Sequence, residues 1–152
     1  MSLVSVLMSP RGLALDCYLA RYTGVSVLNH VFAHTASFEA RPAVVVCTQG
    51  RKTGRWYQVC LPYFQIGDEI MVVGSRGGMP EDPHWAKNLR ANLAGEIYLN
   101  RKLHKVDARF AEGEEYEELW QLASSKVPTY SEYKQRCQGQ RLIPLILLKI
   151  TS

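Results

Sequence analysis

One short turn in the chain has the residue types that a phosphate ligand requires. In the segment Gly50-Arg51-Lys52-Thr53-Gly54, two adjacent cations and a hydroxyl lie between two glycines, so backbone N–H groups and side-chain donors can face the same anion. The segment does not match the Walker pattern. Basic turns are also common on protein surfaces, so on its own the turn is a weak signal and is more typical of a solvated loop.

A second segment of the same kind follows about twenty residues later. In Gly74-Ser75-Arg76-Gly77-Gly78 a predicted strand ends in another hydroxyl, another cation and two conformationally permissive glycines. We expect the two loops to converge on one anion.

Two aromatic segments complete the candidate site. A predicted helix begins near Pro83, where Asp82 is a candidate cap, and its first N–H groups are free to bind ligand carbonyls or phosphates. Trp85 in this helix is more typical of a core residue than of a cofactor contact. Tyr130 and Tyr133 share one face of a later helix, either lining a pocket or packing at the rim of the core.

The composition is that of a globular protein that binds a compact anion. The chain has 152 residues, 47% of them hydrophobic, and a net charge of +4. Six cations fall within 40 residues, whereas no basic arm or nucleic-acid motif is present, so we expect no nucleic-acid partner. The six are Arg51, Lys52, Arg55, Arg76, Lys87 and Arg90.

The cysteines and the N-terminus carry weaker information. Cys17, Cys47, Cys60 and Cys137 include no closely spaced pair, so we interpret them as buried or free thiols and expect no metal site. No secretion signal or membrane-spanning segment is apparent, which predicts a cytoplasmic protein. Residues 13–34 could still lie on a membrane surface.

The elements that must position these residues are mostly short strands. Apolar spacing predicts one helix or two short ones over residues 13–34, with a break at Thr23 and Gly24. The expected strands are 43–48, 55–64, 69–74, 96–99, 103–110 and 143–150, and the later helices are one from about Pro83, 113–126 and 128–138.

This order predicts an α+β fold, mainly β, in which antiparallel strands form a split β-barrel with packed helices. A parallel doubly wound sheet would require strands and helices to alternate regularly, which they do not. We expect an N-terminal helical segment over residues 1–40, packed on or extending from the barrel, and a cofactor-binding barrel domain over residues 41–152.

Taken together, the ordered motifs resemble the deazaflavin-dependent nitroreductase family, the coenzyme F420-dependent reductases with an FMN-binding-split-barrel-like fold. The resemblance runs from about Ala43 to Ile150. It rests on the 50–54 turn, Val72-Val73-Gly74-Ser75 with Gly77-Gly78, Pro83 with Trp85, Asn88-Leu89, Ala91-Asn92, Trp120, Pro128 with Tyr130 and Tyr133, and Ile143-Pro144.

The resemblance implies a role for each candidate residue. The cofactor's phosphate and acidic tail would lie against the two loops, and its deazaflavin ring would face the backbone around His84 and Trp85. The implied cofactor-binding residues are Arg51, Lys52, Thr53, Gly54, Ser75, Arg76, His84, Trp85 and Asn88, and the implied catalytic residues are Tyr130, Tyr133 and Ser75. Of the two tyrosines, Tyr130 is our first choice as proton donor.

The sequence departs from its relatives in ways that concern the pocket. After the basic turn, relatives usually have a proline or polar residue and then an arginine where this chain has Trp56 and Tyr57, and a proline where it has Cys60. Pro62 stands where an aromatic or larger apolar side chain is common, and His84 replaces a commonly apolar residue. The substrate pocket therefore cannot be transferred from the family.

The resemblance implies hydride transfer from reduced coenzyme F420 to an electrophilic small molecule such as an enone, quinone or nitroaromatic compound. Two alternatives remain open at this point. The chain could use FMN, which also offers a phosphate and a tricyclic ring, or it could be a non-catalytic carrier of a lipid, haem or the cofactor. Exposed hairpin edges make a homodimer a further expectation.

Overall fold

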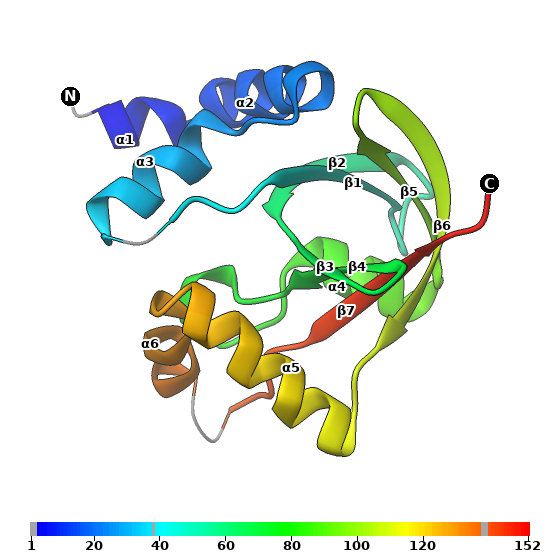
Figure 1. The fold of residues 1–152 in the computed structure, drawn as a ribbon. Coiled ribbons are helices and arrows are strands. Elements are labelled where there is room, and N and C mark those ends of the chain that lie inside the picture. Colours follow the sequence, from blue (N-terminus) through cyan, green and yellow to red (C-terminus); the bar gives the residue numbers. More distant parts are fainter. Residues whose placement is uncertain (1–2, 38, 138–139) are drawn as a thin grey trace.

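The computed structural model describes residues 3–37, 39–137 and 140–152. Figure 1 shows a curled sheet with helices on its outer surfaces. The elements in chain order are α1 (Leu3–Leu7), α2 (Pro10–Thr23), α3 (Val27–Thr35), β1 (Ala43–Gln49), β2 (Trp56–Pro62), β3 (Phe64–Ile66), β4 (Glu69–Val73), a 3₁₀ turn η1 (Arg76–Gly78), α4 (His84–Ala91), β5 (Ala94–Leu99), β6 (Lys102–Phe110), α5 (Gly113–Lys126), α6 (Thr129–Arg136) and β7 (Leu145–Ile150).

The strands form one sheet in the order β2-β1-β5-β6-β7-β4-β3, and every pairing is antiparallel. Its two edge strands, β2 and β3, are separated in the chain by Tyr63 alone. The sheet must therefore curl until its edges approach each other, which is the geometry of a barrel. The prediction of an antiparallel barrel with packed helices is confirmed.

The barrel interior holds the central apolar core. Alternate residues of the strands point inward, as in β1, where Val44 and Val46 belong to this cluster. Helix α4 contributes Trp85, Ala86 and Leu89 to the same cluster. One face of α4 is thus anchored in the barrel, which fixes the position of its polar residues.

The C-terminal helices cover the outside of β4 and β7. In β7, Leu145 and Leu147 pack with α5 and α6, whereas Ile146 and Leu148 point into the barrel. Because both faces of β7 are buried, the strand lacks the polar alternation of a half-buried strand. Tyr116 of α5 ties this layer to the chain before β7, because its hydroxyl donates to the Ile143 carbonyl at 2.7 Å.

The N-terminal helices lie on the other side of the sheet, where α2 packs against β1 and β2 (Figure 1). The predicted break is confirmed, since Gly24 ends α2 in the left-handed conformation at φ 72° and the Ser26 hydroxyl caps α3. Asp16 joins the helices by accepting hydrogen bonds from Ser26 Oγ at 2.5 Å and Val27 N at 2.7 Å. None of the described helices has the length and apolar character needed to cross a bilayer.

Three details differ from the sequence-based expectations. The apolar spacing predicted a helix only from residue 13, whereas α1 begins at Leu3, inside the expected N-terminal helical segment. The predicted 55–64 strand is two strands, because after Pro62 the chain leaves β1 and pairs with β4. Asp82 is not the cap of α4: Pro83 holds that position, and Asp82 pairs with Arg141 instead. Gln138, the expected end of α6, lies outside the described residues.

Candidate functional site

The basic turn between β1 and β2 is closed by its own backbone. Gly50 N donates to the Arg55 carbonyl at 2.7 Å, and Gly54 N donates to the Gly50 carbonyl at 2.8 Å. A Cβ on Gly50 would lie 2.7 Å from the Tyr57 ring and 2.8 Å from Thr53 Oγ1, so a side chain there would have to displace these two exposed side chains. Gly54 adopts φ 73°, which favours glycine on conformational grounds. Both glycines therefore suit the geometry of the turn, Gly54 through its backbone conformation and Gly50 through its close neighbours.

The turn is attached to α4 through Asn88. The Asn88 side chain is buried, and its Oδ1 accepts hydrogen bonds from Arg51 N at 3.2 Å and from Arg51 Nη1 at 2.9 Å. Its Nδ2 donates to Thr48 Oγ1 at 3.1 Å, and Thr48 is itself buried at the end of β1. The second guanidinium nitrogen of Arg51 lies 3.4 Å from His84 Nδ1. Three expected site residues, Arg51, His84 and Asn88, thus form one cluster.

The cations of this turn are not neutralised within the protein. Across the described ranges, ion pairs form between other side chains, and none involves Arg51, Lys52 or Arg55. Unpaired cations held on a rigid turn give a local positive potential that attracts an anion. The first residues of α4 add helix N–H groups on the same side, beside His84.

The second loop has a strained backbone. Arg76, Gly77 and Gly78 follow one another with φ values of 44°, 61° and 77°. A positive φ at a non-glycine residue such as Arg76 is uncommon and marks a conformation that surrounding contacts must enforce.

Arg141 supplies those contacts. Its guanidinium donates to the carbonyls of Ser75 at 2.8 Å, Met79 at 3.0 Å and Gly74 at 3.1 Å, and it pairs with Asp82 at 2.9 Å. The Arg141 side chain is only 8% exposed. One buried arginine therefore holds the whole segment between β4 and α4.

Helix α6 packs against the second loop. A Cβ on Gly78 would lie 3.0 Å from the Tyr133 Cα and 2.9 Å from its carbonyl oxygen, and Arg136 donates to the Gly77 carbonyl at 3.2 Å. Ser75, Arg76 and Tyr133 therefore belong to one part of the molecule. Tyr133 is half-buried, so part of its surface faces solvent.

Tyr130, by contrast, is only 4% exposed and lies in an aromatic cluster with Phe64, Trp120 and Tyr133. Burial raises the pKa of its phenol above the ordinary value, so the hydroxyl stays protonated at neutral pH.

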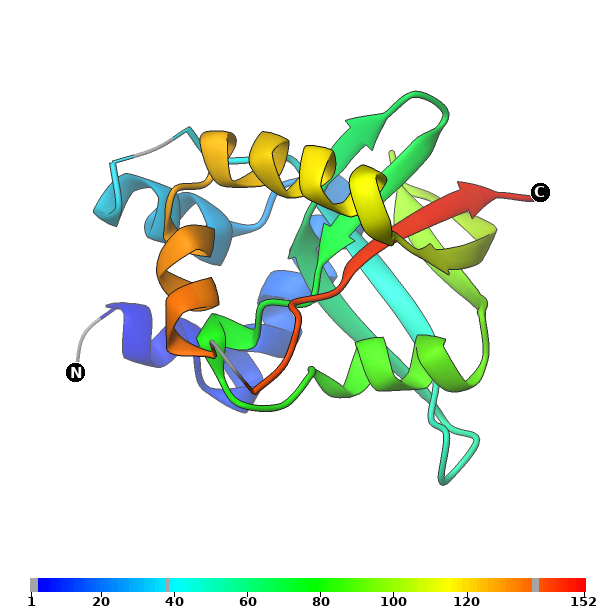
Figure 2. The same cartoon turned by 90° about the horizontal axis from the view of Figure 1, so that it is seen from below.

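The two loops occupy the same side of the molecule without touching in the described residues. Figure 2 shows the basic turn, α4 and η1 along the lower side. No hydrogen bond or ion pair in the described part of the chain joins residues 50–54 to residues 74–78. Convergence on one anion therefore stays a prediction, and an elongated ligand would be needed to contact both.

The Trp85 side chain points into the barrel core and is 9% exposed. Replacing Trp85 with Phe should therefore lower the free energy of unfolding by about 1–2 kcal/mol, because core volume is lost. We expect the cofactor dissociation constant to change less than about twofold, because the indole packs in the core. A twofold change corresponds to less than about 1 kcal/mol. Thermal unfolding and a binding titration of the same variant test this. A large loss of affinity without a loss of stability would place the indole against the ligand.

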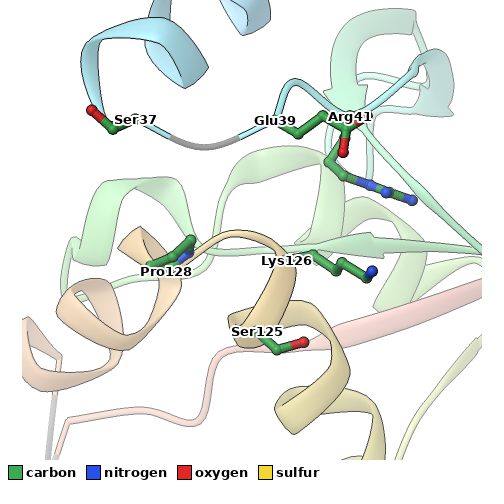
Figure 3. Close-up of a pocket in the computed structure, with 6 residues that line it drawn as sticks. All are labelled: Ser37, Glu39, Arg41, Ser125, Lys126 and Pro128. Atoms are coloured by element: carbon green, nitrogen blue, oxygen red, sulfur yellow. The ribbon is translucent and has the colours of Figure 1, made fainter.

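A pocket of about 340 Å³ opens elsewhere, between the segment before β1 and the α5–α6 connection (Figure 3). Ser37, Glu39, Arg41, Ser125, Lys126 and Pro128 line it, and none of them is an expected site residue. Arg41 stacks on the Phe64 ring at 4.6 Å and thereby borders the aromatic cluster of Tyr130.

Two residues of structural importance to the site were missed from the sequence. In the sequence, Thr48 is one of several β-branched residues of a strand, and Arg141 is an isolated cation before the last strand. Neither position carries a spacing signal, because their partners lie 40 and 59 residues away in the chain. Within the described residues, no group of three or more His, Cys, Asp or Glu side chains is arranged to hold a metal ion.

Comparison with known proteins finds that the chain is similar to F420-dependent reductases. A family model described as F420H(2)-dependent quinone reductase matches residues 25–149. An F420H(2)-dependent quinone reductase of Mycobacterium tuberculosis is 30% identical over 146 residues, which cover 86% of this chain and 95% of the relative.

Solved structures agree with the sequence comparison. The F420-H2 dependent reductase FDR-A is 34% identical, has a TM-score of 0.63, and matches over 72% of this chain and 95% of its own. A structure described as a domain-swapped dimer is 31% identical with a TM-score of 0.63, over 79% of this chain and 92% of its own.

Proposed function

The chain belongs to the F420H(2)-dependent quinone reductase family, and from this premise we propose that it reduces a quinone or a related electrophile at the surface formed by the basic turn, α4 and η1. The protein is an oxidoreductase, and its cofactor is coenzyme F420. The choice of quinone as substrate, and the residue roles given below, are our proposal.

The observation that carries the assignment of the site is the set of unpaired cations. Arg51 and Lys52 lie on a rigid turn, have no acidic partner among the described side chains, and adjoin the N-terminus of α4. Coenzyme F420 carries a phosphate and an acidic tail, and both need such cations. The residues present therefore fit the cofactor that the family uses.

Each residue then has a binding or positioning role. The buried amide of Asn88 holds the Arg51 guanidinium against α4, so little side-chain entropy remains to be lost when an anion binds. Thr53 and Ser75 supply hydroxyl donors, Gly54 shapes the turn, and Arg76 adds a cation on the second loop. Trp85 anchors α4 through its buried side chain, which leaves the backbone at His84 free to face the ligand.

When bound, the reduced cofactor supplies the hydride that the substrate accepts. The protein must orient the acceptor and provide a proton or a hydrogen bond where negative charge develops. We propose Tyr133 for this role in preference to Tyr130, because Tyr133 is half-buried beside the second loop whereas Tyr130 is enclosed by other aromatic rings.

Replacing Arg51 and Lys52 together with Ala should raise the F420 dissociation constant at least about tenfold, since hydrogen bonds to charged groups contribute about 1.5–3 kcal/mol each. Stability should change by less than about 1 kcal/mol, because both charges lie on an exposed turn. Asn88 also keeps its hydrogen bond from the Arg51 backbone N–H. Fluorescence titration and thermal unfolding measure the two quantities.

The matched control removes two positive charges from β6, by Lys102→Ala with Lys105→Ala. If this pair weakened binding as much as the turn variant, general electrostatic attraction would explain the effect and the turn would lose its assignment. An unchanged dissociation constant in the turn variant would exclude the turn from the site.

The alternative readings are distinguished by direct titration. Purified protein titrated separately with coenzyme F420 and FMN should bind F420 more tightly, and the F420H2-loaded protein should reduce a quinone such as menadione. Tighter binding of FMN would overturn the assignment of the bound ligand. Tight F420 binding without turnover of any quinone, enone or nitroaromatic compound would support a carrier.

Two partner proposals accompany the activity. A homodimer is supported by the 31% identical structure that is described as a domain-swapped dimer. Contact of the N-terminal helices with a membrane surface is supported by exposed apolar side chains on α1–α3, including Leu3, Leu15, Tyr18 and Tyr22.

A further inference from the structure

Three of the four cysteines gather where α2 covers the sheet. Cys60 on β2 pairs directly with Val45 on β1, and directly paired residues of antiparallel strands point to the same face. Cys47 lies two residues beyond Val45 and so shares that face. Cys17 and Ala20 of α2 pack on the same small cluster. These thiols are far apart in the sequence and come together only in the folded protein.

Within this cluster, Cys17 and Cys60 interact directly. Both side chains pack on the same cluster where α2 contacts β2, and each thiol shifts the pKa of the other. Both residues are half-buried, so small oxidants can reach them. The interaction joins the N-terminal helical segment to β2.

The electrostatic environment assigns different roles to the two thiols. Hydrogen bonding from Cys60 lowers the pKa of Cys17 below its ordinary value, which favours the nucleophilic thiolate. The same contact, together with burial, raises the pKa of Cys60. This direction favours Cys17 as the attacking thiol and Cys60 as the resolving one.

The remaining cysteines are poor candidates. Cys47 and Cys60 are diagonal neighbours across the β1–β2 pair, for which Cα atoms lie about 7–8 Å apart, beyond the usual range of a disulfide. Burial also raises the pKa of the Cys47 thiol to about 11, which leaves it protonated at neutral pH. Cys137 belongs to the separate cluster under α5 and α6.

We propose that Cys17 and Cys60 form a peroxide-sensitive dithiol whose oxidation to a disulfide ties α2 covalently to β2. The oxidant is hydrogen peroxide or an organic hydroperoxide. Cys17 thiolate attacks the peroxide, the O–O bond breaks, and Cys17 becomes a sulfenic acid as water or an alcohol leaves. Cys60 sulfur then attacks Cys17 sulfur and loses its proton. The S–S bond forms, the sulfenic oxygen departs as water, and two thiols have been oxidised by one peroxide.

The consequence is a change in how firmly the N-terminal helices are held. In the reduced protein α2 is held on the sheet by the small Ala20 cluster, by the cation–π contact of Arg21 with Tyr98, and by the hydrogen bond between their side chains. A Cys17–Cys60 disulfide closes a loop of more than forty residues, which restricts the unfolded chain. We expect the melting temperature to rise by roughly 5 °C or more on oxidation.

The test uses the full chain without cofactor, so it does not depend on the proposed reductase activity. Protein is treated with a small molar excess of hydrogen peroxide, remaining thiols are alkylated, and the product is digested without reductant and analysed by mass spectrometry. The expected result is a Cys17–Cys60 cross-linked peptide, the loss of two alkylatable thiols, and reversal of both changes by dithiothreitol.

Matched serine variants complete the experiment. Cys60→Ser should abolish the cross-link and leave Cys17 as a sulfenic acid that dimedone traps, whereas Cys137→Ser should form the cross-link as the wild type does. If Cys60→Ser folds poorly, the peptide map of the oxidised wild-type protein still shows whether Cys17 and Cys60 are cross-linked. Four free thiols after peroxide treatment, or a cross-link that involves Cys47 or Cys137, would overturn the proposal.

Discussion

Replacement of Arg141 with Met should destabilise the protein more than any single change on its surface. Arg141 is buried, pairs with Asp82, and donates to three backbone carbonyls of the segment between β4 and α4. Methionine fills similar space but leaves the Asp82 carboxylate without its main partner. Removal of one member of a buried ion pair costs about 3–5 kcal/mol, and the cost here should lie at the lower end, because the Asp82 side chain is 19% exposed and Arg90 lies 3.8 Å from its carboxylate. For a chain of this size, that corresponds to a fall in melting temperature of about 10 °C.

The effect should extend to cofactor binding, because Arg141 shapes the loop that presents Ser75 and Arg76. We expect the F420 dissociation constant of Arg141→Met to rise even below the melting transition. Arg136→Met is the matched control, since Arg136 is exposed and makes one hydrogen bond to the same loop. A melting temperature for Arg141→Met within about 2 °C of the wild type would show that the arginine does not hold the loop.

The elements that the sequence predicts well are those whose pattern follows from burial on one or two faces. The 113–126 helix is found with these bounds, because its apolar spacing matches a helix lying on a sheet. The split of the 55–64 segment could not be predicted. Its residues remain extended on both sides of Tyr63, and what changes there is the partner strand, from β1 to β4. Pairing partners are a property of the folded sheet, which local spacing does not report.

In the site, too, local features can be predicted from the sequence and long-range contacts cannot. The glycines and cations of the 50–54 turn are recognisable from the sequence, because Gly54 adopts a positive φ and Gly50 lies close to Tyr57 and Thr53. The resemblance includes Asn88, but its role in holding this turn is not recognisable from the sequence, and neither is that of Thr48, since both act through hydrogen bonds between distant segments. The same limit applies to Cys17 and Cys60, whose contact exists only because α2 packs on β2.

The position of the tyrosines changes the expected proton donor. Helical spacing places Tyr130 and Tyr133 on one face, and it does not say which of them is covered. In the fold, Phe64 and Trp120 enclose the Tyr130 ring, whereas Tyr133 is half-buried and its backbone lies against Gly78 of the second loop. A group that donates to a substrate must be reachable by it, so the structure favours Tyr133.

Replacing Tyr133 with Phe should therefore slow hydride transfer by about 10²-fold, the usual cost of removing one donor that stabilises developing negative charge. The F420 dissociation constant should stay near its wild-type value, because Tyr133 is proposed to contact the substrate and not the cofactor. Single-turnover oxidation of the reduced cofactor by menadione, followed at the F420 absorbance, measures the step. Tyr130→Phe is the matched control: its hydroxyl lies in a buried aromatic cluster, so the rate should change by less than about threefold, below 1 kcal/mol. If the Tyr133→Phe, Tyr130→Phe and double variants all keep the wild-type rate, the proton comes from water and the tyrosines only shape the pocket.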